Sequence, residues 1–97
     1  MRIVRLTIRG RVQGIGYRAF VEDGAVARGL KGWVRNRHDG SVEALIAGES
    51  NEVDAMIAVC RQGPRSARVD AVEIEEADEQ ALAVRYPGEV FSMLPTA

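Results

Sequence analysis

The segment KGWVRNRHDGSVEALIAG, residues 31–48, holds two stretches rich in apolar residues on either side of an Asp-Gly pair. Glycine adopts a positive φ without steric cost, so Asp39-Gly40 between two such stretches indicates a β-hairpin turn. We therefore expect strands over residues 31–36 and 41–48 that pair antiparallel. This hairpin excludes an all-parallel sheet.

A strand and a helix are expected before the hairpin. The strand pattern alternates apolar with polar residues: Val4, Leu6 and Ile8 against Arg5, Thr7 and Arg9. A period of two is typical of a half-buried strand. Good helix formers dominate residues 18–30, and we expect Glu22 and Asp23 in the first turn, near the positive end of the helix dipole. Gly24 costs this helix about 1 kcal/mol relative to alanine, and we expect close packing against the sheet to explain it.

A second helix and further strands are expected after the hairpin. Ser50 or Asn51 can cap the helix, and Gly63-Pro64 ends it. Its apolar residues recur with helical spacing, at Val53, Met56, Ile57 and Cys60. A strand over residues 68–76 follows, and EVFSML, residues 89–94, can form a short last strand whose register the pattern leaves open. Residues 77–88 give no clear assignment.

The resulting order is strand, helix, strand, strand, helix, strand, with a short extra terminal strand. A chain of 97 residues is enough for one domain and too short for two, so residues 1–97 are expected to form a single domain. A ferredoxin-like α+β sandwich satisfies this order with short connections. We predict one antiparallel sheet with two helices on one face.

Composition narrows the class of protein. The balance of 46% hydrophobic and 28% charged residues is ordinary for a soluble domain. The sequence contains neither an apolar run of about 18 residues nor the apolar core of a signal peptide, so we expect a cytoplasmic protein without a membrane anchor. Cys60 is the only cysteine, which excludes an intrachain disulfide. Monomer is the default expectation for the oligomeric state.

Charge is unevenly distributed along the chain. The net charge of −1 argues against nonspecific binding to nucleic acid. Residues 1–38 nevertheless carry nine Arg or Lys against two acidic residues, a net of +7, whereas residues 39–97 have a net of −8. An anionic ligand is therefore attracted to the N-terminal part.

The stretch GRVQGIGYRAF, residues 10–20, leads into the first helix without a capping side chain. Ser, Thr, Asp and Asn are all absent between Gly10 and Tyr17. The free N–H groups at the start of a helix then bind water or an external anion, and the residues alone leave both open. Gly14 and Gly16 let the backbone approach a ligand closely. Arg18 can grip two phosphate oxygens at once.

Other phosphate-binding motifs fit less well. GIGYRA formally matches a dinucleotide-binding fingerprint, but the following strand enters a hairpin instead of crossing over to a parallel neighbour. The Gly-Lys-Ser/Thr of a Walker loop is absent. Cys60 followed by RQGPR is one residue shorter than a cysteine-phosphatase loop, and Cys60 lies on the apolar stripe of its helix. We therefore interpret Cys60 as a core thiol.

The segments GRVQGIGYR (residues 10–18) and GWVRNRHDGSVEALIAG (residues 32–48) resemble the two signature segments of the acylphosphatases. Ile15 and Tyr17 are conservative replacements in the first segment. The second keeps its glycines, aromatic residue, asparagine and valine in the family's spacing. The order of elements extends the resemblance to roughly residues 3–94. Acylphosphatases are small ferredoxin-like sandwiches, which agrees with the predicted fold.

The resemblance implies hydrolysis of acyl phosphates to carboxylate and inorganic phosphate, with no metal and no cofactor. Arg18 matches the family's phosphate-binding arginine, and Asn36 matches the asparagine that orients the attacking water. Ser41 stands where a hydroxyl can hydrogen-bond that asparagine, which implies a role in orienting it. The backbone cradle for the phosphate corresponds to Gly10, Arg11, Val12, Gln13, Gly14, Ile15, Gly16 and Tyr17. The expected partner is a small acyl phosphate.

One residue, His38, and two alternative functions also bear on this prediction. His38 is expected to be exposed in the hairpin turn, and one histidine without a second ligand is no metal site. A non-catalytic module of the same fold, which binds an anion or serves an assembly, remains the second hypothesis. Single-stranded RNA binding needs exposed aromatic residues on central strands, and only 5% of the residues are aromatic.

Overall fold

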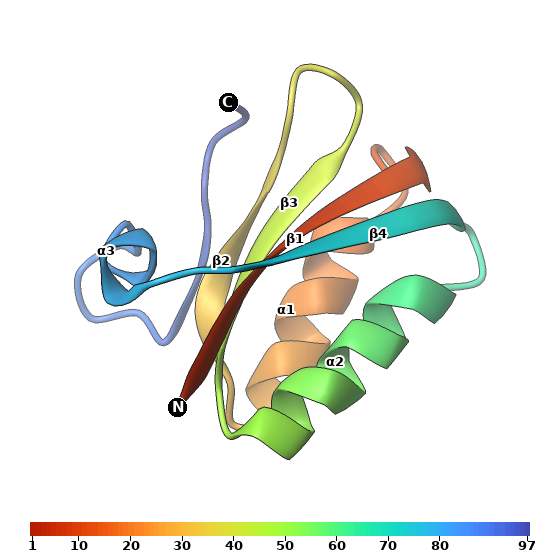
Figure 1. Ribbon diagram of the computed structural model, residues 1–97. Helices are drawn as coiled ribbons and strands as arrows, with labels where there is room; N and C mark the ends of the chain where they lie inside the picture. The colour runs from red at the N-terminus through yellow and green to blue at the C-terminus, as the bar shows by residue number, and fades with distance from the viewer.

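The computed structural model describes residues 1–97 as a five-stranded sheet with two long helices on one face (Figure 1). Its elements in chain order are β1 (Arg2–Arg11), α1 (Tyr17–Ala27), β2 (Lys31–Asn36), β3 (Val42–Gly48), α2 (Ser50–Gln62), β4 (Arg68–Glu76), α3 (Glu79–Leu82) and β5 (Phe91–Met93). The strand order in the sheet is β4-β1-β3-β2-β5. The ferredoxin-like arrangement predicted from the sequence is confirmed.

The predicted hairpin forms between β2 and β3. These strands pair antiparallel, with Asn36 opposite Val42 at the turn end. The Arg37 N–H donates to the Ser41 carbonyl at 2.8 Å and closes the turn. Gly40 has a φ of 93°, the conformation for which glycine was expected. Asn36 therefore lies at the end of a strand whose neighbours hold it in place.

The last strand corrects the predicted sheet. β5 pairs parallel with β2, with Met93 opposite Val34, so the sheet is mixed and not wholly antiparallel. β4 occupies one edge of the sheet and β5 the other. β4 runs antiparallel to β2. After β4 the chain passes to the other edge of the sheet and reverses its direction, so β5 runs parallel to β2. This pairing places Met93 beside the strand that carries Asn36.

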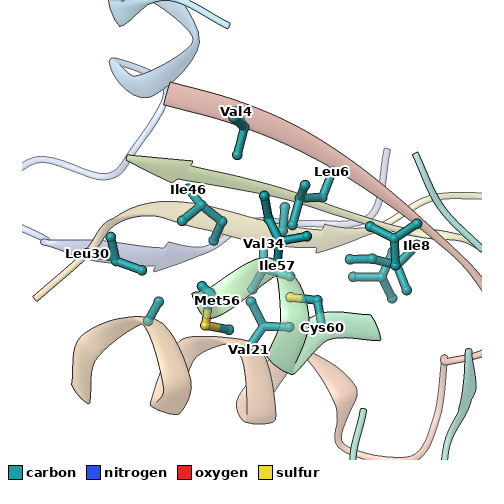
Figure 2. Packing of buried hydrophobic residues seen from close by; sticks show 14 of the residues in the cluster. Val4, Leu6, Ile8, Val21, Leu30, Val34, Ile46, Met56, Ile57 and Cys60 are labelled. Carbon is teal, nitrogen blue, oxygen red and sulfur yellow. The ribbon is translucent and has the colours of Figure 1, made fainter. Parts of the chain in front are cut away.

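The main core lies between the sheet and the two long helices (Figure 2). Val4, Leu6 and Ile8 of β1 point toward Val21 of α1 and Cys60 of α2, and all of them are buried. Burial raises the pKa of the Cys60 thiol to about 11. The prediction that Cys60 is a core thiol is confirmed.

Gly24 makes its close approach to a helix and not to the sheet. A Cβ built on Gly24 of α1 would lie 3.0 Å from the terminal methyl of Met56 in α2. The expectation of packing against the sheet is therefore wrong, because the helix face that carries Gly24 meets the neighbouring helix. The missing side chain lets α1 and α2 pack closely.

The ends of the helices also differ from the sequence predictions. α1 begins at Tyr17, so Glu22 and Asp23 lie beyond its first turn and cannot complement its positive end. Ser50 and Asn51 already lie inside α2, whose N-cap is Glu49; the Glu49 carboxylate accepts a hydrogen bond from the Asn51 N–H at 3.1 Å. The positive end of α1 therefore has no acidic side chain of its own.

The opposite face of the sheet is partly covered by the segment that the sequence left unassigned. α3 lies across this face (Figure 1), and a second apolar cluster forms beneath it. Its six buried residues are Ile3, Trp33, Leu45, Ala47, Leu82 and Leu94. The Trp33 indole N–H donates to the Ala81 carbonyl at 2.8 Å. None of the helices is long and apolar enough to span a membrane.

Candidate active site

The start of α1 offers a row of unused backbone donors. Gly16 is the N-cap residue, and no side chain caps the helix. None of the backbone N–H groups from Val12 to Ala19 donates a hydrogen bond within the chain; the first to do so is that of Phe20, which donates to the Gly16 carbonyl at 3.1 Å. Such donors at the positive end of a helix dipole favour an anion.

Gly14 and Gly16 give the loop its shape. Their φ values are 75° and 83°, in the left-handed region that side chains with a Cβ disfavour. A Cβ built on either residue would meet no atom within 4 Å, so backbone conformation and not crowding requires glycine here. Both glycines line the pocket, so the turn they create brings the backbone of the loop to the pocket.

This loop forms one wall of a pocket of about 320 Å³. The lining residues are Val12, Gly14, Gly16, Tyr17, Arg18, Ala19, Asn36 and Met93. They come from the loop, the first turn of α1, the end of β2 and β5. None of them is acidic, a histidine or a cysteine, so the pocket presents only neutral dipoles and one cation to a ligand.

Arg18 supplies that cation, and nothing else in the chain neutralises it. Arg18 makes no ion pair and no side-chain hydrogen bond. In contrast, three arginines on the face of the sheet opposite the long helices are paired: Arg5, Arg35 and Arg37 all contact the carboxylate of Glu43. An unpaired guanidinium beside unused N–H donors is a strong site for a dianion.

Asn36 faces the same pocket from the sheet. It lies two residues after Val34, so both side chains are on the helix-covered face of β2. Its Oδ1 is buried and has no hydrogen-bond partner in the chain. A buried acceptor without a partner is costly unless a ligand or water satisfies it. The structure thus brings Arg18 and Asn36 together at one pocket, although Arg18 is at the start of α1 and Asn36 is at the end of β2.

The loop that faces the pocket is shorter than the predicted cradle, Gly10 to Tyr17. Gly10 and Arg11 belong to β1 and pair with Val69 and Arg68 of β4, so they do not line the pocket. Gly10 lies at a bulge in that pairing. Since the ladder with β4 holds this part of the chain, the loop that faces the pocket begins at Val12.

Only some of the remaining cradle residues line the pocket. Val12, Gly14, Gly16 and Tyr17 line the pocket, whereas Gln13 and Ile15 do not. Ile15 packs against the main core. The side chains of Gln13 and Ile15 therefore hold the loop to the rest of the molecule.

Tyr17 holds the start of α1 against α2. Its ring is buried, and its hydroxyl donates to the Cys60 carbonyl at 2.8 Å. Burial raises the pKa of the phenol far above its ordinary value, so Tyr17 stays neutral and serves as an anchor. This contact explains why a large aromatic residue stands at the first position of α1, directly after the tight turn at Gly16.

Ser41 does not make the contact predicted for it. Its hydroxyl donates to Asp39 Oδ1 at 2.6 Å, and its backbone N–H donates to the same oxygen at 2.9 Å. A nearby carboxylate is a stronger acceptor than the neutral amide of Asn36. The hydroxyl therefore stabilises the turn and leaves Asn36 without a side-chain partner. Asp39 in turn has its pKa lowered, chiefly by the Ser41 hydroxyl.

Ala19 and Met93 line the pocket and were not predicted. The position of Ala19 directly after Arg18 in the first turn of α1 is a signal that could have identified it. Met93 had no such signal, because its place depends on the parallel pairing of β5 with β2. His38 is exposed, as predicted, and no group of three His, Cys, Asp or Glu side chains is placed to hold a metal ion.

The fold and the pocket define a class of protein: a ferredoxin-like sandwich with a pocket formed by unused backbone amides and one unpaired arginine. Comparison with known proteins gives the family. The family model described as Acylphosphatase matches residues 4–86. This chain belongs to the acylphosphatase family.

Individual relatives agree with this assignment. An acylphosphatase from Bradyrhizobium diazoefficiens is 61% identical over 94 residues, which cover 97% of this chain and 95% of that protein. The crystal structure of an acylphosphatase from Bacillus subtilis has a TM-score of 0.83 at 34% identity and covers 97% of this chain and 99% of that one. Full-length HypF in its phosphate- and nucleotide-bound form shares the fold, with a TM-score of 0.81 at 24% identity over 98% of this chain and 12% of that one.

Proposed function

We propose that this chain hydrolyses acyl phosphates, with Arg18 and the loop amides binding the phosphate and Asn36 orienting the attacking water. The observation that carries this assignment is the shared pocket of Arg18, which has no ion pair, and Asn36, whose buried Oδ1 has no partner. The substrate is a small molecule with a carboxyl–phosphate anhydride. The single domain over residues 1–97 supplies every residue of the pocket.

Phosphate binding uses groups that are already in place before the substrate arrives. The N–H groups of Val12 to Ala19 have no acceptor within the chain and are free to donate to an anion, and the guanidinium of Arg18 adds further donors. In phosphoryl transfer most of the catalysis consists of positioning and electrostatic stabilisation of the equatorial oxygens. Fixed amides and one arginine provide this without reorganising during the reaction.

Asn36 acts on the nucleophile. Its Oδ1 accepts a hydrogen bond from a water molecule and aims one lone pair of that water at phosphorus. A carboxamide is too weakly basic to take the proton. The water oxygen forms its bond to phosphorus while the bond to the carboxylate oxygen breaks, and the proton passes to a phosphate oxygen of the substrate. The carboxylate is a good leaving group, so the reaction needs no strong base.

The lining of the pocket supports a mechanism in which Arg18 and the amides bind the phosphate and Asn36 only orients the water. It contains no carboxylate, histidine or cysteine that would act as a base or as a covalent nucleophile. His38 is exposed in the hairpin turn and is not part of the lining. No side chain of the protein therefore takes the proton of the attacking water, which passes to the substrate phosphate.

Two further predictions belong to this proposal. The protein acts as a monomer, which is supported by a pocket built from the loop, α1, β2 and β5 of one chain. It acts in the cytoplasm, where the single buried thiol of Cys60 stays reduced. Size-exclusion chromatography at assay concentration tests the first prediction, and cell fractionation tests the second.

The experiment that tests the function is hydrolysis of benzoyl phosphate in the presence of EDTA. We expect the wild type to turn the substrate over and the Asn36→Ala variant to lose nearly all turnover while it still binds inorganic phosphate. EDTA is expected to leave the rate unchanged. A normal rate for Asn36→Ala would show that the asparagine does not orient the water.

A non-catalytic anion-binding module is the alternative, and the same experiment separates the two. That module would bind inorganic phosphate without turning over any acyl phosphate. The unpartnered Oδ1 of Asn36 favours the enzyme, because binding a phosphate already held by Arg18 and the loop amides does not need an additional buried acceptor.

A further inference from the structure

Gln13 connects the phosphate loop to the hairpin that carries Asn36. Its side-chain Nε2 donates to the Arg37 carbonyl at 2.7 Å and to the Ser41 carbonyl at 2.8 Å. These two carbonyls belong to the residues that close the β2–β3 turn, where the Arg37 N–H also donates to Ser41. The backbone of Gln13 lies in the loop beside the pocket, so a single residue reaches both halves of the site.

The side chain of Asn36 depends on its backbone for its position. Because its Oδ1 has no partner in the chain, no hydrogen bond to that oxygen fixes the carboxamide before a water arrives. Its own carbonyl accepts from the Ala97 N–H at 3.1 Å on one side of β2. On the other side, the next residue, Arg37, is held by Gln13 at 2.7 Å. The end of β2 is therefore fixed from both sides.

We propose that Gln13 is a positioning residue that sets the distance and angle between the bound phosphate and Asn36. This inference rests on the proposed function. The loop holds the phosphate, the hairpin holds Asn36, and the Gln13 carboxamide is the side-chain hydrogen-bonding link between them. A water aimed by Asn36 then meets phosphorus in line only while this link is intact.

The chemistry of the link requires a glutamine. Two carbonyl oxygens need two donors, and one NH₂ group supplies both. A glutamate of the same length offers no donor when ionised and places a negative charge against two carbonyls. An alanine removes the link entirely. Asparagine is one methylene shorter than the span between the loop backbone and the hairpin.

A positioning role predicts that binding and turnover separate. The N–H groups and Arg18 that bind the phosphate do not involve the Gln13 side chain, so the inhibition constant for inorganic phosphate is expected to stay close to that of the wild type. Turnover depends on the alignment of water and phosphorus. A displacement of about 1 Å in such an alignment lowers a rate by about a hundredfold, so we expect kcat to fall by roughly ten- to a hundredfold.

The test compares kcat and KM for benzoyl phosphate, and the inhibition constant for phosphate, in the wild type and in Gln13→Ala. Ser66→Ala is the matched control, because the Ser66 hydroxyl also bonds the loop, at the Ile15 carbonyl (3.4 Å), but does not reach the hairpin. We expect Ser66→Ala to behave as the wild type. The inference is overturned if kcat of Gln13→Ala is unchanged, or if phosphate binding weakens in parallel with kcat.

The Gln13→Glu variant provides a second test with a pH signature, under conditions where thermal melting shows all variants to be folded. A protonated carboxyl donates one hydrogen bond and an ionised carboxylate donates none. The ratio of kcat in Gln13→Glu to kcat in the wild type should therefore rise as the pH falls. The charged or polar hairpin residues Arg37, His38 and Asp39 are the same in both proteins, so the ratio removes their contribution.

Gln13→Ala is the control for this profile, and its ratio to the wild type should stay constant with pH. A constant ratio for Gln13→Glu would overturn the inference. A wild type without acyl phosphate hydrolysis would instead refute the proposed function and this inference with it, so the two failures are distinguishable.

Discussion

Replacing Arg18 by glutamine tests the electrostatics of the site directly. The guanidinium makes no ion pair and no hydrogen bond within the chain, so the substitution breaks neither kind of internal contact. Arg18 is half-buried at the start of α1. We expect the free energy of unfolding to change by no more than about 0.5 kcal/mol, as for ordinary surface substitutions. The whole effect should therefore appear in ligand binding and rate.

The size of that effect follows from the bonds that are lost. A guanidinium grips a phosphate with two charge-assisted hydrogen bonds, each worth about 1.5–3 kcal/mol. Both together amount to roughly 3–6 kcal/mol, and about 1.4 kcal/mol corresponds to a factor of ten. Because the pocket is open to solvent, we take the lower end and expect kcat/KM to fall by about a hundredfold or more.

The assay is hydrolysis of benzoyl phosphate, with inorganic phosphate as a competitive inhibitor. Arg18→Lys keeps the charge without the forked geometry and should fall between the wild type and Arg18→Gln. Arg61→Gln is the matched control, because it removes the same charge from an exposed position in the last turn of α2. If Arg18→Gln binds phosphate as tightly as Arg61→Gln does, the guanidinium does not hold the phosphate.

Three other predictions concern the fold. Gly32→Ala should unfold the protein or lower its melting temperature severely, since a Cβ there would overlap the Leu45 carbonyl and the φ is 153°; a folded variant with wild-type melting would contradict the packing. The Cys60 thiol, with its pKa raised to about 11, should resist iodoacetamide in the native state and react after denaturation; fast native labelling would place it at the surface. The lowered pKa of Asp39 stabilises the fold above the ordinary carboxyl range. The wild type should therefore melt at a higher temperature than Asp39→Asn, and this difference should shrink as the pH falls from about 5 to 2. A difference that does not depend on pH would contradict this.

Local signals in the sequence predicted most of the elements. The apolar alternation of β1, the helical spacing on α2 and the Asp39-Gly40 turn each depend on residues close together in the chain. The predicted strand over residues 68–76 has the bounds of β4. The absence of a capping side chain before α1 was also evident from local residues, because helix ends follow local chemistry, and the structure has no side-chain cap there.

Errors arose where a distant segment decided the outcome. β5 is parallel to β2 because the chain crosses the whole sheet after β4, and a strand of three residues carries too little pattern to show its direction. Gly24 meets Met56 of the other helix, which the pattern within α1 could not show. Met93 lines the pocket because β5 pairs with β2, which the sequence also could not show.

The sequence by itself determined the hairpin, the order of the main helices and strands, and the absence of a capping side chain just before Arg18. Only the tertiary structure decided how the two halves of the site are joined, through Gln13 and the carbonyls of Arg37 and Ser41. The physical reason is that a side-chain amide bonded to backbone carbonyls leaves no pattern in the sequence. Every residue carries a carbonyl, and the fold alone selects which of them a distant glutamine meets.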